Sequence, residues 1–189
     1  MKVYFVRHGF AYHNLGAELY GEKAYEMSEY KNSRLTTLGK IQATELGQKL
    51  ANIRFDKIYC SPLVRCIDTC LKIPGNSQNT IILDDNLMEP QGKHICNKRD
   101  SKQEIIQYIE SINRTFDISR VKDDYDFKVE TEDDVLERIN TVVEDLKFQI
   151  GKCQNVLVVT HHDWLYKFYN FYDKEPVQFK NCEYRIFEL

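Results

Sequence analysis

Charged, amide and imidazole side chains recur at a few places in this sequence, each shortly after a stretch typical of a β-strand. These places hold two arginines, several histidines, one carboxylate and one amide: Arg7, His8, Asn14, Arg65, Glu89, His161 and His162. The forked N–H groups of arginine neutralise and orient a tetrahedral dianion, and a neutral imidazole can attack it. The residue types therefore point to chemistry on a phosphoryl group.

The strands that precede these residues would bring them together. Strands are predicted over Lys2–Arg7, Lys57–Cys60, residues 80–83 and Asn155–Thr160. The last contains a continuous apolar run, which is typical of a central parallel strand covered on both faces. Since ligands bind beyond the carboxyl ends of the strands in open parallel sheets, the polar residues after these strands should line one site.

Helical patterns alternate with the strands, which favours an α/β sheet. Hydrophobic spacing and capping signals predict helices over residues 38–53, from Ser61-Pro62 to about 72, after the capping box Ser101–Glu104, from Thr131 to a C-terminal cap at Gly151, and over about 163–171. The remaining predictions are a turn at 74–76, a solvated acidic loop over 117–134 and an edge strand over 183–189.

These elements predict a three-layer α/β/α fold with a mostly parallel central sheet, an antiparallel edge strand and a helical insertion. The 189 residues fit a single domain, with the insertion at about 92–151.

Composition and charge indicate which classes of partner and which location to expect. The net charge of −3 gives no general reason to bind nucleic acid or an acidic membrane surface. No apolar run approaches the ~20 residues that cross a bilayer. Met1-Lys2 leads directly into the first strand without the features of a signal peptide. We therefore expect a cytoplasmic protein with a small-molecule partner, whose six cysteines are free thiols.

Five motifs in order resemble those of one family. Arg7-His8-Gly9 with Asn14 looks like the opening motif of the histidine phosphatase (phosphoglycerate mutase-like) superfamily. The resemblance continues through Leu-Thr-Thr-Leu-Gly-Lys-Ile-Gln-Ala at 35–43, Cys-Ser-Pro-Leu-Val-Arg at 60–65, Leu-Met-Glu at 87–89 and Val-Val-Thr-His at 158–161. The resemblance reaches from residue 2 to about 165 and leaves mainly the insertion unmatched.

The resemblance implies a role for each residue. His8 would be the nucleophile that forms a phosphohistidine, and Glu89 would be the general acid and base. The phosphoryl oxygens would be bound by Arg7, Asn14, Arg65 and His161, with His161 also facing the developing charge and His162 a further candidate donor. The scheme needs neither a metal nor a cofactor.

The sequence departs from the family pattern at several positions. Phe10 and Ala11 stand where the family commonly has a polar pair, which predicts the loss of one phosphate-binding hydroxyl. His162 replaces a glycine and would narrow the pocket or add a donor. The stretch 15–34 is expected to shape the entrance. Structural or solvated roles are expected for His13, His94, Lys93, Lys98 and Arg99.

Phosphomonoester hydrolysis is the favoured activity, because the chain is short for the mutase branch and the region around Glu89 is more like the phosphatase branch. Phosphoglycerate mutase-type transfer and a phospho-ligand-binding module without turnover stay open.

Two other chemistries, those of a cysteine phosphatase and of a metallohydrolase, fit the sequence less well. A cysteine phosphatase would need five residues between Cys60 and Arg65, which have four, and the side chains of His161 and His162 would diverge rather than share a metal with Asp163.

Overall fold

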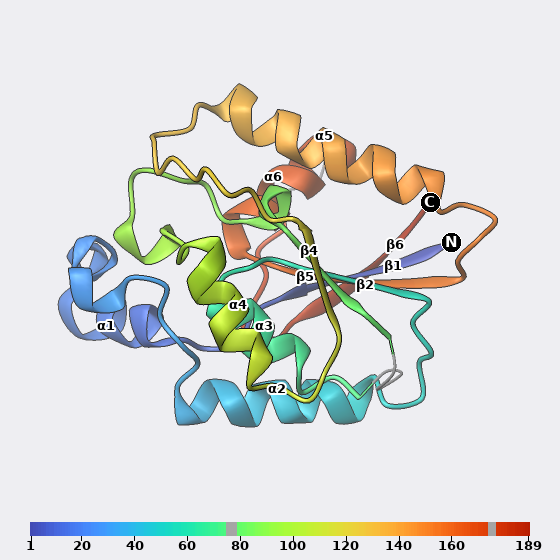
Figure 1. Ribbon diagram of the computed structural model, residues 1–189, viewed down its shortest axis with the longest axis horizontal. Helices are drawn as coiled ribbons and strands as arrows, with labels where there is room; N and C mark the ends of the chain where they lie inside the picture. Colours follow the sequence, from blue (N-terminus) through green and yellow to red (C-terminus); the bar gives the residue numbers. More distant parts are fainter. Residues whose placement is uncertain (75–78, 174–176) are drawn as a thin grey trace.

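The computed structural model describes residues 1–74, 79–173 and 177–189. Its centre is a six-stranded sheet in the order β4-β3-β2-β5-β1-β6 (Figure 1). The strands are β1 (Lys2–Arg7), β2 (Lys57–Cys60), β3 (Ile81–Asp84), β4 (Phe116–Arg120), β5 (Asn155–Thr160) and β6 (Tyr184–Glu188). All neighbours pair in parallel except β6, which runs antiparallel to β1 at the edge. The predicted sheet is confirmed.

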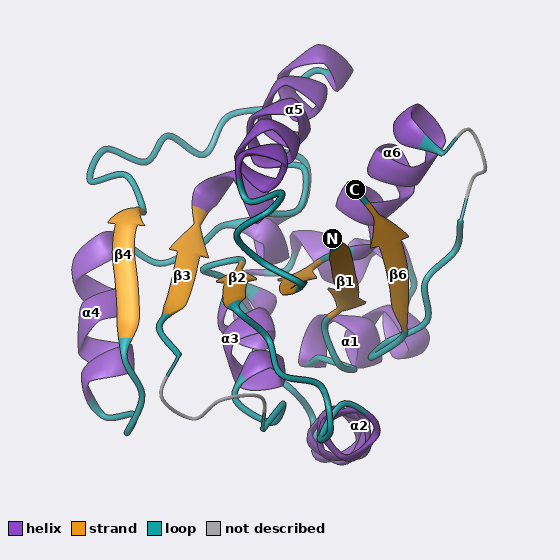
Figure 2. Cartoon of the chain, turned by 90° about the vertical axis from the view of Figure 1, so that its right-hand side faces the viewer, coloured by secondary structure: helices purple, strands orange, loops and turns teal. Residues whose placement is uncertain are grey.

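Helices cover both faces of this sheet (Figure 2). They are α1 (Tyr12–Tyr20), α2 (Thr37–Lys49), α3 (Val64–Cys70), α4 (Lys102–Glu110), α5 (Glu132–Phe148) and α6 (His162–Tyr172). Short 3-10 turns lie between them, among them η1 (Glu22–Glu26), η3 (Asp85–Leu87) and η4 (Ile95–Asn97). None of the helices in the described ranges is long and apolar enough to cross a membrane.

Strand alternation sends β1 side chains into two separate cores. Val3 and Phe5 pack with residues of α5 and α6, where Trp164 stacks on Phe168. Tyr4 and Val6 pack on the opposite face with residues of α2, α3 and α4. Because β1 and β5 are covered on both faces, every residue from 156 to 160 is buried, as the continuous apolar run predicts. The three-layer architecture follows from these two cores.

The predicted acidic loop over 117–134 is wrong for its first four residues, which belong to β4. Within the described ranges this strand pairs with β3 alone, at the edge of the sheet, and its side chains are half-buried or exposed. An edge strand needs little apolar surface, so its sequence pattern is weak. Residues 92–151 therefore contribute a strand to the sheet as well as α4 and α5.

Two predicted helix ends are also wrong. Leu63, not Ser61, is the N-cap of α3, and the Ser61 hydroxyl lies 2.8 Å from Nε2 of His161 instead. Helix α5 ends at Phe148 with Gln149 as its cap, while Gly151 occupies the following turn with a φ of 80°. The turn predicted at 74–76 falls mostly outside the described residues.

Candidate active site

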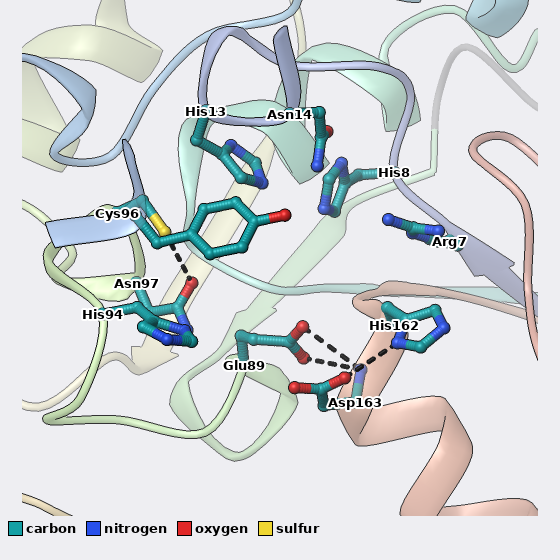
Figure 3. A pocket seen from close by; sticks show the side chains of 11 residues that line it. Arg7, His8, His13, Asn14, Glu89, His94, Cys96, Asn97, His162 and Asp163 are labelled. Atoms are coloured by element: carbon teal, nitrogen blue, oxygen red, sulfur yellow. Dashed lines mark hydrogen bonds and ion pairs between the residues drawn. The ribbon is translucent and has the colours of Figure 1, made fainter. Parts of the chain in front are cut away.

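A pocket opens at the carboxyl ends of β1, β3 and β5. Its walls come from the loop after β1, from α1, from the segment after β3 and from the start of α6 (Figure 3). The lining residues are Arg7, His8, His13, Asn14, Tyr25, Glu89, His94, Cys96, Asn97, His162 and Asp163. The topology thus brings together most of the polar residues that the sequence places after separate strands.

The N-terminal part of α2 and its N-cap hold the loop that follows β1. The Phe10 amide donates to Oε1 of Gln42 at 2.9 Å, and the Phe10 carbonyl accepts from the Thr36 hydroxyl at 3.0 Å. A Cβ on Gly39 would lie 2.1 Å from the Phe10 carbonyl oxygen. Thr36, Gly39 and Gln42 belong to the motif at 35–43, so the motif's structural role is to fix this loop.

His8 is buried at the pocket wall, and its contact with a backbone carbonyl defines the tautomer of its ring. Its Nδ1 lies 2.7 Å from the carbonyl oxygen of Gly9, which can only accept, so Nδ1 carries the proton. Nε2 is therefore the unprotonated nitrogen of the neutral ring. Burial, followed by the positive charge of Arg65, lowers the pKa of His8 well below its ordinary value. A neutral imidazole with a free lone pair suits a nucleophile.

Arg7 and Asn14 lie beside His8, and each has an N–H donor that a ligand could use. Nη1 of Arg7 donates to the Phe179 carbonyl at 2.6 Å, whereas its buried Nε has no partner among the described residues. Oδ1 of Asn14 accepts from the Ala11 amide at 3.0 Å, so the Asn14 amide nitrogen is left for a ligand. Both side chains lie with His8 along one wall in Figure 3.

Arg65 and His161 lie behind the pocket surface rather than on it, and both are buried. The guanidinium of Arg65 donates to the Cys96 carbonyl at 2.9 Å and to Oδ1 of Asn97 at 3.0 Å, while its Nε has no partner in the described part of the chain. The ring of His161 lies 5.2 Å from that of His8. Burial and the Arg65 charge also lower the pKa of His161 well below its ordinary value.

Glu89 occupies the opposite wall, bound to the N-terminus of α6. Its carboxylate accepts from the amides of Asp163, at 3.1 and 3.2 Å, and of Trp164, at 3.1 Å. Burial and the negative charge of Asp163 raise the pKa of Glu89 to about 7, against the opposing effect of the two amides. A carboxyl group in this range can both give and take a proton near neutral pH.

His162 stands at the pocket rim and is held by two acceptors. Its Nδ1 lies 2.8 Å from Oδ1 of Asp163, and its Nε2 lies 2.6 Å from Oε1 of Gln178. The contact with Asp163 raises the pKa of His162, and two acceptors favour the doubly protonated ring. His162 therefore brings positive charge to the rim, although both of its nitrogens already have protein partners.

Several lining residues carry no local signal in the sequence. Tyr25 comes from η1, in the stretch expected to shape the entrance, and Cys96 and Asn97 come from η4. His13 and His94, expected to be structural, also line the pocket.

Arg99 is not solvated on the surface, contrary to expectation. It is buried and pairs with Asp85 at 2.9 Å. The partner lies 14 positions away in the sequence, so no local pattern could reveal the pair.

The two less suitable chemistries lose support from the same geometry. Cys60 is fully buried outside the pocket lining, and burial raises the pKa of its thiol well above the ordinary value, so it is not a thiolate nucleophile. His161 points toward Ser61 and Cys66, whereas His162 points toward Asp163 and Gln178. The two rings therefore do not converge on one ligand.

Comparison with known proteins gives the family of the chain. Residues 3–184 match the sequence profile of the histidine phosphatase superfamily (branch 1), so the chain belongs to this superfamily. A probable phosphoglycerate mutase of Arthroderma benhamiae is 30% identical over 134 residues, which are 59% of this chain and 39% of the relative. An ecdysteroid-phosphate phosphatase of Drosophila melanogaster is 42% identical over 55 residues, which are 25% of this chain and 7% of the relative. The matches thus span less than half of either relative.

Solved structures share the fold at low identity. The ecdysone phosphate phosphatase of Bombix mori, in complex with tungstate, aligns with a TM-score of 0.68 and 17% identity over 98% of this chain and 88% of that one. A phosphoserine phosphatase of Entamoeba histolytica, in complex with 3-phosphoglyceric acid, aligns with a TM-score of 0.64 and 20% identity over 99% and 90%. Both confirm the α/β architecture.

Proposed function

We propose that the protein hydrolyses small phosphomonoesters through a phosphohistidine on His8, without a metal or cofactor. The observation that carries the proposal is one pocket with two complementary groups. Neutral His8 has its lone pair on Nε2, and Glu89, whose pKa is about 7, lies on the opposite wall. The family membership and the phosphatases among its relatives and structural neighbours support the same activity.

In the first step, Nε2 of His8 attacks phosphorus, and the bond from phosphorus to the alcohol oxygen breaks. Glu89 gives its proton to that oxygen, so the alcohol leaves uncharged. The N–H donors of Arg7 and Asn14 bind phosphoryl oxygens, Arg65 and His162 supply positive charge around them, and the neutral ring of His161 supplies a further N–H group beside His8. Phosphoryl transfer depends mainly on such positioning and electrostatics.

In the second step, the Glu89 carboxylate takes a proton from a water molecule, and the resulting oxygen attacks phosphorus. The P–N bond breaks, the electron pair returns to Nε2 of His8, and inorganic phosphate leaves. Glu89 ends protonated and His8 ends neutral, so both are ready for the next cycle. The pKa of about 7 suits Glu89 to both directions of proton transfer.

Mutase-type transfer is the second candidate, because one relative is named a probable phosphoglycerate mutase. In that reaction the phosphoryl group returns from His8 to a second hydroxyl instead of to water. Release of inorganic phosphate distinguishes hydrolysis from transfer. A cytoplasmic location, with no nucleic-acid or membrane partner, belongs to the proposal as well.

The test compares wild-type protein with His8→Ala on a generic aryl phosphate in the presence of EDTA. The wild type should release phosphate, and the variant should lose at least about 1,000-fold in kcat/KM, the scale seen when a nucleophile is removed. The matched control is Glu137→Gln, because Glu137 is exposed and remote from the pocket lining. Turnover that survives in His8→Ala would contradict the phosphohistidine. Binding of vanadate without turnover by the wild type would favour the binding module.

A further inference from the structure

We propose that His13 is an additional phosphoryl-binding residue, whose Nε2 supplies the donor that Phe10 and Ala11 do not provide. This inference rests on the proposed function, since it assumes that a phosphoryl group occupies the pocket beside His8. It assigns a ligand-binding role to a side chain that lies outside the motifs shared with the family.

Ser33 fixes the position of the His13 ring. His13 lies in the first turn of α1 and is 6% exposed. The Ser33 hydroxyl oxygen lies 2.8 Å from Nδ1 of the ring and accepts from the His13 backbone amide at 3.2 Å. Two contacts to one hydroxyl hold a buried ring in a defined orientation, so its other nitrogen is aimed rather than free to rotate.

That other nitrogen, Nε2, faces the pocket. His13 lines the cavity, and its ring centre is 5.5 Å from that of His8 (Figure 3). No residue in the described ranges forms a hydrogen bond with Nε2 of His13. A histidine with a purely structural role would normally have both ring nitrogens satisfied when it is this deeply buried. One satisfied nitrogen and one facing the cavity instead indicate a ligand on the cavity side.

The chemistry of the ring fits a neutral donor. Burial, followed by the charges of Arg65 and Arg7, lowers the pKa of His13 well below its ordinary value, which favours the uncharged ring. The Ser33 hydroxyl can donate its proton to Nδ1, which leaves the ring proton on Nε2. A phosphoryl oxygen selects this tautomer, since the other would present a lone pair to an anion.

The neighbouring residues explain why such a donor is needed. Ala11 is fully buried against Leu35 and Ala43 and has no polar side-chain atom. The Phe10 amide is already bonded to Gln42, and the Ala11 amide to Asn14. Positions 10 and 11 therefore offer no donor to the pocket. His13 offers one from the same wall.

Two substitutions of His13 distinguish the role of Nδ1 from that of Nε2. The side-chain amide of His13→Asn reaches about as far as Nδ1, so it can keep the contact with Ser33 but removes the donor at Nε2. The longer amide of His13→Gln reaches about as far as Nε2, so it keeps a donor in the pocket. Inhibition by orthovanadate, product inhibition by inorganic phosphate and kcat/KM for an aryl phosphate would be measured for both, with the thermal midpoint of each variant.

We expect His13→Asn to bind vanadate and phosphate about 10- to 100-fold more weakly, as expected for loss of one donor to a charged group, and His13→Gln to stay within about threefold of the wild type. Equal affinity in wild type and His13→Asn would overturn the inference. Equal losses in both variants, with a lowered thermal midpoint, would also overturn it and leave a structural role. If the wild type binds vanadate in a His13-dependent way but releases no phosphate, hydrolysis fails and this inference stands.

Discussion

The two walls of the pocket are built and charged in different ways. The wall that follows β1 carries neutral imidazoles and N–H donors that have no hydrogen-bond partner among the described residues, on α1 and on a loop held by α2. The wall formed by Glu89 and the start of α6 carries two carboxylates, of which Glu89 is held by backbone amides at the helix N-terminus and Asp163 contacts His162. Burial lowers the pKa of His8 on the first wall and raises that of Glu89 on the second.

This difference divides the reaction between the walls. Burial disfavours the charged form of any group, so it leaves His8 as a neutral imidazole with an unprotonated Nε2, and Glu89 partly protonated near neutral pH. The first wall can then bind and attack a dianion while the second supplies and removes protons. Single substitutions on each wall should therefore affect different observables.

The largest effect expected on the second wall is that of Glu89→Gln. The amide cannot transfer a proton, so kcat should fall by about 100- to 10,000-fold for an alkyl phosphate, the range for loss of a general acid or base. An aryl phosphate with a stable leaving group should depend less on this group in the first step. Pre-steady-state release of the alcohol measures that step. Equal losses in this step for alkyl and aryl substrates would contradict the role of Glu89 as the acid.

The substitution Gly39→Ala tests whether the packing of α2 fixes the loop of the first wall. The new Cβ would lie 2.1 Å from the Phe10 carbonyl oxygen, so the loop or α2 must move. Overpacking of this kind costs about 1–3 kcal/mol of unfolding free energy. Urea unfolding measures it, and kcat/KM should fall in parallel because the loop carries His8.

The control for this substitution is Lys40→Ala. Lys40 is the next residue of α2 and is exposed, so its loss should change stability by less than about 0.5 kcal/mol. Equal stability of Gly39→Ala and the wild type would refute the bracing role of α2.

The smallest effect expected is a shift in pH dependence on the second wall. The charge of Asp163 raises the pKa of Glu89, so Asp163→Asn should lower that pKa. Glu89 must be protonated to act as the acid, and kcat/KM falls as pH rises through its pKa. This alkaline limb should therefore move to lower pH in Asp163→Asn. Measurement with one substrate for both proteins removes the titration of the substrate from the comparison. An unmoved limb, or one at higher pH, would argue against coupling between the two carboxylates.

The sheet and much of the site could be predicted because their signals are local. The apolar run before His161, the polar residues after each strand and the motif around Gly39 are all read from neighbouring positions. Strand β4 could not be found in this way, since an edge strand with half-buried side chains resembles a loop. The burial of Arg99 depends on Asp85, which only the fold brings into contact.

The site residues that escaped prediction share the same cause. Tyr25 and Asn97 enter the pocket from 3-10 turns whose positions depend on tertiary contacts. A structural role is expected for His13 because an isolated histidine in a sequence carries no information about what its second ring nitrogen contacts. The contact with Ser33 and the position of the cavity distinguish a ring with both nitrogens satisfied from one with a nitrogen that faces the cavity.

The most direct test of the central claim is to trap the phosphorylated enzyme. Glu89→Gln would be mixed with an aryl phosphate and quenched under alkaline conditions that preserve phosphohistidine, and its peptides would be analysed by mass spectrometry. The first step should proceed with this leaving group while hydrolysis is slowed, so one phosphoryl group should accumulate on His8. A phosphoryl group on another residue, or turnover by the wild type with no phosphorylated peptide in either protein, would contradict the account.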